Sequence, residues 1–100
     1  MTMSDRALPS PQDYTLLTWQ ERQDLRERYL QAQDGDCFYC KAPLYRRVPK
    51  NIRKVKIDRS LFPGDFLKYP VHLQHNHDTN MTEGAVHAYC NAVMWQHEGR

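Results

Sequence analysis

The sequence contains no run of about 18 consecutive apolar residues, which is the minimum that a membrane-spanning helix requires. Its first twelve residues, MTMSDRALPSPQ, lack the apolar core of a secretory signal peptide. The first absence excludes a helical membrane protein, and the second favours an intracellular one. We therefore expect a cytoplasmic protein with no membrane contact, in which cysteine thiols stay reduced.

Apolar residues are scarce in general. They make up 40% of the 100 residues, on a count that includes tyrosine and cysteine, and the mean hydropathy is −0.85. One domain of this size with so few apolar residues has a thin core, and such domains usually depend on a disulfide, a metal or a partner. The net charge of +2 is small, so any basic surface must be local.

Only three cysteines are present, and an odd number argues against a closed disulfide framework. Cys37 and Cys40 form a C-x-x-C pair, and His87 and Cys90 have the same interval. Zinc prefers four sulfur or nitrogen donors at tetrahedral angles, and two donors on a tight turn provide half of that set. The spacing predicts a structural Zn²⁺ site at these four residues. The alternatives are that the cysteines are buried apolar side chains, or that the C-x-x-C pair is a redox centre.

The N-terminal half predicts an arm followed by a helix. Residues 1–12 contain two prolines and few apolar groups, which indicates a disordered arm before a single domain over 13–100. Thr18 and Glu21 have the spacing of a capping box, and apolar residues recur after them at helical intervals. We expect a helix over 19–33, ended by a turn at Asp34-Gly35-Asp36.

The C-terminal half predicts two strands and a helix. Residues 54–58 and 71–75 alternate between apolar and polar side chains, which is typical of short strands. The segment NHDTNMTEGA, residues 76–85, is rich in turn-forming residues, and 91–97 has a helical composition. The chain is therefore expected to be a small α+β domain.

Three of the five histidines, His72, His75 and His77, fall within six residues. The segment LQHNH and the later HAYCN resemble the catalytic strand and helix start of the ββα-metal nucleases, also called His-Me finger or HNH nucleases. The closest resemblance is to the phage recombination endonuclease VII group, since LLTWQERQDLRERYLQAQDGDCFYCKAPL is similar to its first helix and first zinc pair. In that group two C-x-x-C pairs hold the zinc, so His87 would replace one sulfur donor.

The resemblance implies a zinc-bound ββα-metal domain with an N-terminal helix. It also implies a metal-dependent endonuclease that nicks or cleaves DNA, encoded by a phage and active in the cytoplasm of a bacterial host. His75 would be the general base that accepts a proton from the attacking water, and His77 would contact the phosphate or orient that water. A catalytic Mg²⁺ or Mn²⁺ would bind Gln74 and Asn91, the residues before the base and after the last zinc ligand.

Gln74 departs from the pattern of the resemblance. The endonuclease VII group has Asp at this position and many relatives have His, whereas the neutral amide of Gln74 is a weaker ligand than a carboxylate. Either Gln74 serves as a poor ligand, or His77, Asp78 or a water takes its place, or the site is impaired. His72 is a weaker substitute, because it lies roughly 7 Å from Gln74 along the strand.

Between the two halves of the zinc set, residues 45–59 form a basic insertion. Seven basic residues occur there with Asp58 as the only acid, namely Arg46, Arg47, Lys50, Arg53, Lys54, Lys56 and Arg59. Each cation that neutralises a phosphate releases counterions, so this segment predicts salt-sensitive binding to DNA. The alternative is a solvated basic loop without a ligand.

Two other classes of function remain open. A catalytically impaired zinc module on the same scaffold would bind DNA or a protein without cleaving it, and a redox protein would use Cys37 and Cys40. DNA is the expected partner in the nuclease reading. A homodimer, or a phage packaging or replication protein, is left open as a further partner.

Overall fold

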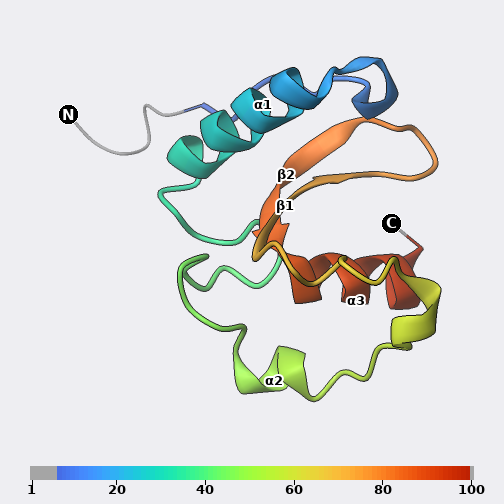
Figure 1. Cartoon of the computed structure of the whole chain (residues 1–100). Helices are drawn as coiled ribbons and strands as arrows, with labels where there is room; N and C mark the ends of the chain where they lie inside the picture. Colours follow the sequence, from blue (N-terminus) through green and yellow to red (C-terminus); the bar gives the residue numbers. More distant parts are fainter. Residues whose placement is uncertain (1–6, 100) are drawn as a thin grey trace.

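In the computed structural model, which describes residues 7–99, a two-stranded antiparallel sheet lies between two longer helices, and a short third helix packs against the C-terminal one (Figure 1). The helices and strands are α1 (Trp19–Ala32), α2 (Lys50–Arg53), β1 (Val71–His75), β2 (Thr82–His87) and α3 (Ala88–Glu98), with short 3-10 helices η2 (Tyr14–Leu16) and η3 (Arg59–Leu61). The expected α+β class is confirmed. Within the described residues, every helix is too short or too polar to cross a lipid bilayer.

The first helix begins at the predicted capping box. The Thr18 hydroxyl accepts from the Glu21 amide at 3.1 Å, and the Glu21 carboxylate accepts from the Thr18 amide at 2.8 Å. Leu25 and Tyr29 are one turn apart and both are buried, so this face of α1 packs on the sheet. The Tyr29 hydroxyl lies 3.0 Å from the Thr82 hydroxyl at the start of β2. The predicted helix over 19–33 is confirmed to within one residue.

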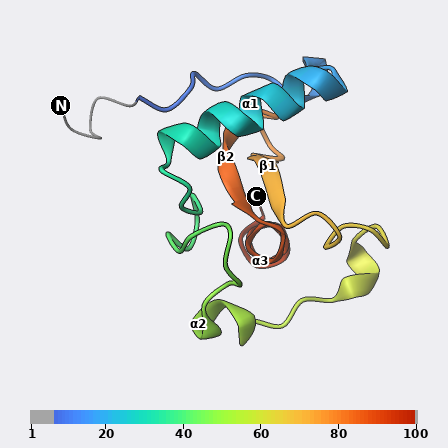
Figure 2. The same ribbon diagram turned by 60° about the vertical axis from the view of Figure 1, so that its left-hand side comes forward.

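The hairpin of β1 and β2 lies between α1 and α3 (Figures 1 and 2). Val71 pairs with His87, and Gln74 with Gly84, before the register becomes irregular between Gln74 and His75. The start of α3 is also tied to the start of β1, because the Ala88 amide donates to the Pro70 carbonyl at 2.9 Å. The first turn of α3 therefore lies beside the first residues of β1.

The free edge of β2 is covered by the end of α1 and by the turn that follows it. The side-chain amide of Gln33 both donates to and accepts from the backbone of Ala85, at 2.9 Å in each case. The Phe38 amide donates to the same Ala85 carbonyl at 2.9 Å. Gly84 permits this approach, because a Cβ there would lie 2.8 Å from Phe38 Cγ. The C-x-x-C turn therefore packs closely against β2.

Residues ahead of α1 also join the hairpin. Gln12 exchanges two hydrogen bonds with Thr82, of 2.9 and 3.0 Å, and the Tyr14 amide donates to the Asn80 carbonyl at 2.8 Å. Residues 1–6 of the expected arm lie outside the described residues. Because Gln12 is held on the hairpin, the neighbouring Tyr14 is placed beside β1.

Two sequence expectations are wrong. Residues 54–58 form no strand; they follow α2, and Val55 and Ile57 pack on the core instead of pairing with another strand. The expected loop over 76–85 ends at residue 81, because β2 begins at Thr82. Nearly every residue of β2 is buried, so its sequence lacks the alternation that marks a half-exposed strand.

We predict that Gly84→Ala destabilises the protein by about 1–3 kcal/mol, because the new methyl group overlaps Phe38 and Gln33. Denaturant unfolding measures the change. Gly64→Ala is the matched control, since a Cβ there meets no atom within 4 Å. Equal stability of the two variants would contradict this packing.

Candidate metal centre and active-site cleft

The four predicted zinc ligands come together in the structure. The ligand atoms of Cys37, Cys40, His87 and Cys90 all lie within 4.8 Å of one another. His87 Nδ1 is 3.4 Å from Cys40 Sγ and 3.7 Å from Cys90 Sγ. In a tetrahedral zinc site, bond lengths of about 2.3 Å to sulfur and 2.0 Å to nitrogen place such atoms about 3.5 Å apart. This Cys₃His group could therefore hold a metal ion such as zinc.

Local structure presents the donors from two segments. In the turn, Cys37 Sγ accepts from the amides of Tyr39 and Cys40 at 3.4 and 3.5 Å. The turn closes at Lys41, which has a positive φ of 68° and donates its amide to the Cys37 carbonyl at 3.0 Å. The other two donors flank the junction of β2 and α3, where His87 is the N-cap residue and Cys90 lies in the first helical turn.

The His87 ring is held in one tautomer. Its Nε2 lies 3.1 Å from the Pro43 carbonyl oxygen and 2.9 Å from that of Arg46. Carbonyl oxygens only accept, so Nε2 must carry the proton and Nδ1 presents its lone pair to the sulfur atoms. Backbone acceptors of this kind orient metal-binding histidines in proteins.

Contacts among the three sulfur atoms and burial shift the pKa values of the cysteines in different directions. A hydrogen bond from Cys90 is the largest influence on Cys37 and, with backbone amides, outweighs burial and brings the pKa of Cys37 to about 4. The same contact, together with burial, raises the pKa of Cys90, and burial raises the pKa of Cys40. A divalent cation would allow all three to become thiolates, which is the form that binds metal.

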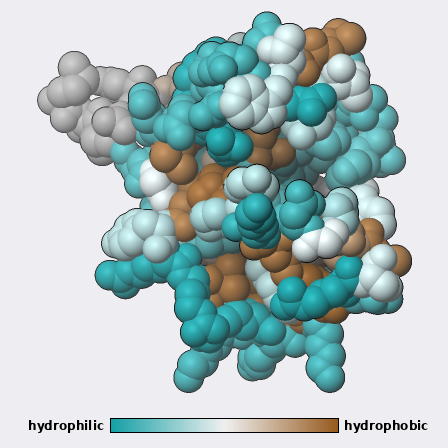
Figure 3. Space-filling view, in the orientation of Figure 1, coloured by the Kyte–Doolittle hydropathy of each residue, from teal (hydrophilic) through white to brown (hydrophobic). Residues whose placement is uncertain are grey.

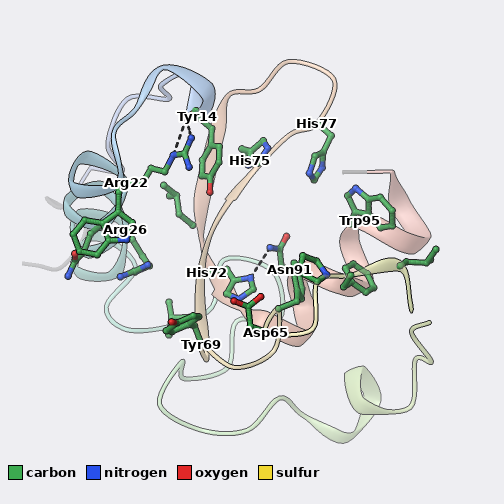
Figure 4. Close-up of a pocket in the computed structure, with 18 residues that line it drawn as sticks. Tyr14, Arg22, Arg26, Asp65, Tyr69, His72, His75, His77, Asn91 and Trp95 are labelled. Atoms are coloured by element: carbon green, nitrogen blue, oxygen red, sulfur yellow. Dashed lines mark hydrogen bonds between the residues drawn. The ribbon is translucent and has the colours of Figure 1, made fainter. Parts of the chain in front are cut away.

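A cleft of about 800 Å³ lies along β1, between α1 and α3 (Figure 4). Three predicted catalytic residues, His75, His77 and Asn91, line it together with His72. Figure 3 shows apolar side chains exposed across the middle of the molecule, between hydrophilic regions above and below. The structure thus brings the predicted base and the predicted helix ligand to one cavity.

His75 belongs to a stack of three side chains. The centres of the His75 and Tyr14 rings lie 4.1 Å apart, at an interplanar angle of 14°. The Arg22 guanidinium carbon lies 3.9 Å from the centre of the Tyr14 ring. Figure 4 shows Tyr14 between Arg22 and His75. Burial lowers the pKa of His75, and the neighbouring His77 and Arg22 lower it further. His75 is therefore neutral at pH 7 and able to accept a proton.

Asn91 lies in the first turn of α3, directly after the metal-group residue Cys90. Its Nδ2 is 3.1 Å from His72 Nδ1. Trp95 lies one turn further along the same helix face, and its ring centre is 6.3 Å from that of His77. Residues of α3 and of the hairpin therefore meet across the cleft.

Gln74, the predicted second ligand of the catalytic metal, has a different environment. Its side chain is fully buried and is not among the residues that line the cleft. Its Nε2 donates to the His75 carbonyl at 3.0 Å, and its Oε1 has no hydrogen-bond partner within the described part of the chain. Asp78, one of the alternatives to Gln74, does not line the cleft either. The structure brings Asn91 together with His72 and leaves Gln74 in the interior.

The seven predicted DNA-binding residues lie on and around α2. Arg46, Arg47, Lys50, Arg53, Lys54, Lys56 and Arg59 are all exposed, and none of them lines the cleft. The cations in the cleft are Arg22 and Arg26 of α1, which the sequence prediction missed. Their spacing of four residues beside the apolar stripe of α1 was an available signal. Tyr14 had no such signal, because only tertiary contacts bring it to His75.

Comparison with known proteins gives no matching family model, no matching curated protein and no matching solved structure. The resemblance to ββα-metal nucleases thus stays a prediction from the residues.

We predict that the reduced protein binds about one equivalent of Zn²⁺ and that Cys40→Ser or His87→Ala abolishes this binding. Chelation should unfold the domain, because binding a structural metal contributes directly to folding free energy. Metal analysis and thermal denaturation measure both effects. His77→Ala removes an imidazole outside the group and should leave the zinc content unchanged. Full thermal stability after chelation would refute a structural role for the group.

Proposed function

We propose that the protein is a metal-dependent DNA endonuclease of the ββα-metal type. The observation that carries this proposal is the shared cleft, where His75 and His77 of the hairpin face Asn91 of α3. The order of β1, β2 and α3 corresponds to the elements that name this nuclease class. The Cys₃His group, which ends one residue before Asn91, supports the proposal because it would fix the helix that carries this residue.

The reaction is the hydrolysis of a phosphodiester bond. A water oxygen attacks the phosphorus atom while the neutral imidazole of His75 accepts a proton from that water. The bond between phosphorus and the 3′ oxygen breaks, and the leaving oxygen takes a proton from solvent. The products are a 5′-phosphate and a 3′-hydroxyl, and His75 then returns its proton to solvent. The Tyr14 ring orients the His75 imidazole by stacking on it.

A bound divalent cation would neutralise charge on the phosphate and stabilise the leaving 3′ oxygen. The donor chemistry of the cleft fits such an ion, because Asn91 presents an amide group there. Gln74 does not line the cleft, so its Oε1, which has no partner among the described residues, supplies no donor there. Asn91 and one residue of β1 would hold the ion.

Contacts with DNA would form at two surfaces. Arg22 and Arg26 lie within the cleft, where they can neutralise phosphates of the strand that is cut. Trp19 and Tyr69 line the same cleft and are 76% and 59% exposed, which leaves their rings free to stack on bases. The exposed basic residues around α2 would contact more distant phosphates and add affinity without reading sequence.

A second candidate is a zinc module that binds DNA without cutting it. The observation that favours it is the burial of neutral Gln74, where the resemblance requires an acidic or imidazole ligand. The two candidates differ in one measurable property, the cleavage of DNA.

We predict that the protein nicks supercoiled plasmid in the presence of Mg²⁺ or Mn²⁺. His75→Ala should lower the rate by about 10²–10⁴-fold, because it removes the general base. His97→Ala is the control, since His97 is exposed on α3 and outside the cleft. DNA retardation in a gel without nicking by either protein would favour the binding module.

The pH dependence of nicking should follow the pKa of His75. Since burial, His77 and Arg22 lower this pKa, activity should persist on acidification through pH 6.5 and fall only below it. Arg22→Gln removes a positive charge, so it should raise the pKa of His75 and move the acid limb to higher pH. The variable to measure is kcat/KM between pH 5 and 8. An acid limb above 6.5 in the native protein would exclude His75 as the base.

A further inference from the structure

We propose that His72, in place of Gln74, is the ligand that β1 contributes to the catalytic cation. This inference rests on the nuclease function proposed above and identifies the metal ligands of that same cleft. It also makes the cation a divalent transition ion such as Mn²⁺.

The distance between His72 and Asn91 suits two neighbouring ligands of one cation. His72 Nδ1 and Asn91 Nδ2 are 3.1 Å apart. Octahedral coordination with bonds of about 2.1 Å places adjacent donor atoms about 3.0 Å apart. A half-turn of the Asn91 amide exchanges its nitrogen and oxygen with little change in position. The Asn91 oxygen and His72 Nδ1 would then both point at one ion.

The surroundings of His72 resemble those of a metal-binding histidine. The Phe66 ring meets the His72 ring edge-on, with ring centroids 4.7 Å apart. Burial lowers the pKa of His72, and the backbone of Phe66 and Tyr69 acts in the opposite direction as a hydrogen-bond acceptor. Such partners hold the ring and leave one nitrogen with a lone pair for a ligand. His72 is half-buried and lines the cleft, with its Nδ1 directed at Asn91.

Chain topology explains why His72, and not Gln74, meets Asn91. His72 pairs with Val86, two residues before α3 begins, whereas Gln74 pairs with Gly84, four residues before it. The first turn of α3 is tied to the start of β1 through Ala88 and Pro70, as described above. Asn91, in that first turn, therefore faces the early residues of β1.

The donor set determines which cation fits. Imidazole binds first-row transition ions more strongly than Mg²⁺, which prefers oxygen donors and retains its waters. The Asp65 carboxylate lines the same cleft, and Figure 4 shows it at the end of the cleft where His72 and Asn91 lie. A site with one imidazole, one amide oxygen and a nearby carboxylate favours Mn²⁺ over Mg²⁺.

The test measures Mn²⁺ binding and plasmid nicking on the same proteins. Zinc-loaded wild type is titrated with Mn²⁺ and followed by electron paramagnetic resonance of the free ion. His72→Phe keeps a ring against Phe66 but removes the nitrogen donor, and Gln74→Met keeps the buried volume but removes the amide. We expect His72→Phe to weaken Mn²⁺ binding by more than about 10-fold and to slow nicking. Loss of a residue that only supports a metal ligand already costs about 10-fold in affinity, so loss of a ligand itself should cost more. Gln74→Met should change both by less.

Zinc content and thermal unfolding establish that each variant is folded. If His72→Phe fails to fold, Mn²⁺-induced broadening of the His72 imidazole signals in wild-type NMR spectra decides the question, and its absence rejects the ligand role. Loss of Mn²⁺ binding and nicking in Gln74→Met, with both retained in His72→Phe, would overturn this inference while the nuclease function stands. Mn²⁺ binding that depends on His72, without nicking by wild type, would uphold the cation site and reject the nuclease function.

Discussion

The convergence of Cys37, Cys40, His87 and Cys90 is the constraint on which the rest of the structure depends. It joins the turn after α1 to the junction of β2 and α3, two segments that are far apart in the sequence. The apolar core is small, and several of its buried residues are alanines or the cysteines themselves. A metal ion at this group would therefore contribute much of the folding stability that a larger domain gains from its apolar core.

The same group lies directly beside the cleft. Cys90 and Asn91 are neighbours in the first turn of α3, and Asn91 lines the cleft with its side chain against His72. The hydrogen bond between Ala88 and Pro70 brings that turn to the beginning of β1. A structural metal bound by Cys90 and a catalytic cation bound by Asn91 would thus be held by adjacent residues of α3.

The sequence predicted the features that depend on local spacing. The capping box at Thr18 and Glu21 and the strand over 71–75 needed no tertiary information. The ligand pairs were predictable because zinc geometry restricts donor spacing. The sequence did not predict β2, because burial on both faces removes the alternation that marks a strand. It did not predict the position of Tyr14 beside His75 either, because that contact joins residues far apart in the sequence. The interior position of Gln74 was not predictable either, because the alternation of β1 does not show which of its polar side chains is buried.

The most direct measurement is NMR of the Asn91 side-chain amide in zinc-loaded and in chelated protein. If the Cys₃His group positions the cleft, the loaded protein shows one dispersed pair of Asn91 amide proton signals with a nuclear Overhauser effect to the His72 ring. Chelation then removes that effect, and zinc restores it. Persistence of the contact between Asn91 and His72 in fully zinc-free protein would contradict the dependence of the cleft on the metal group.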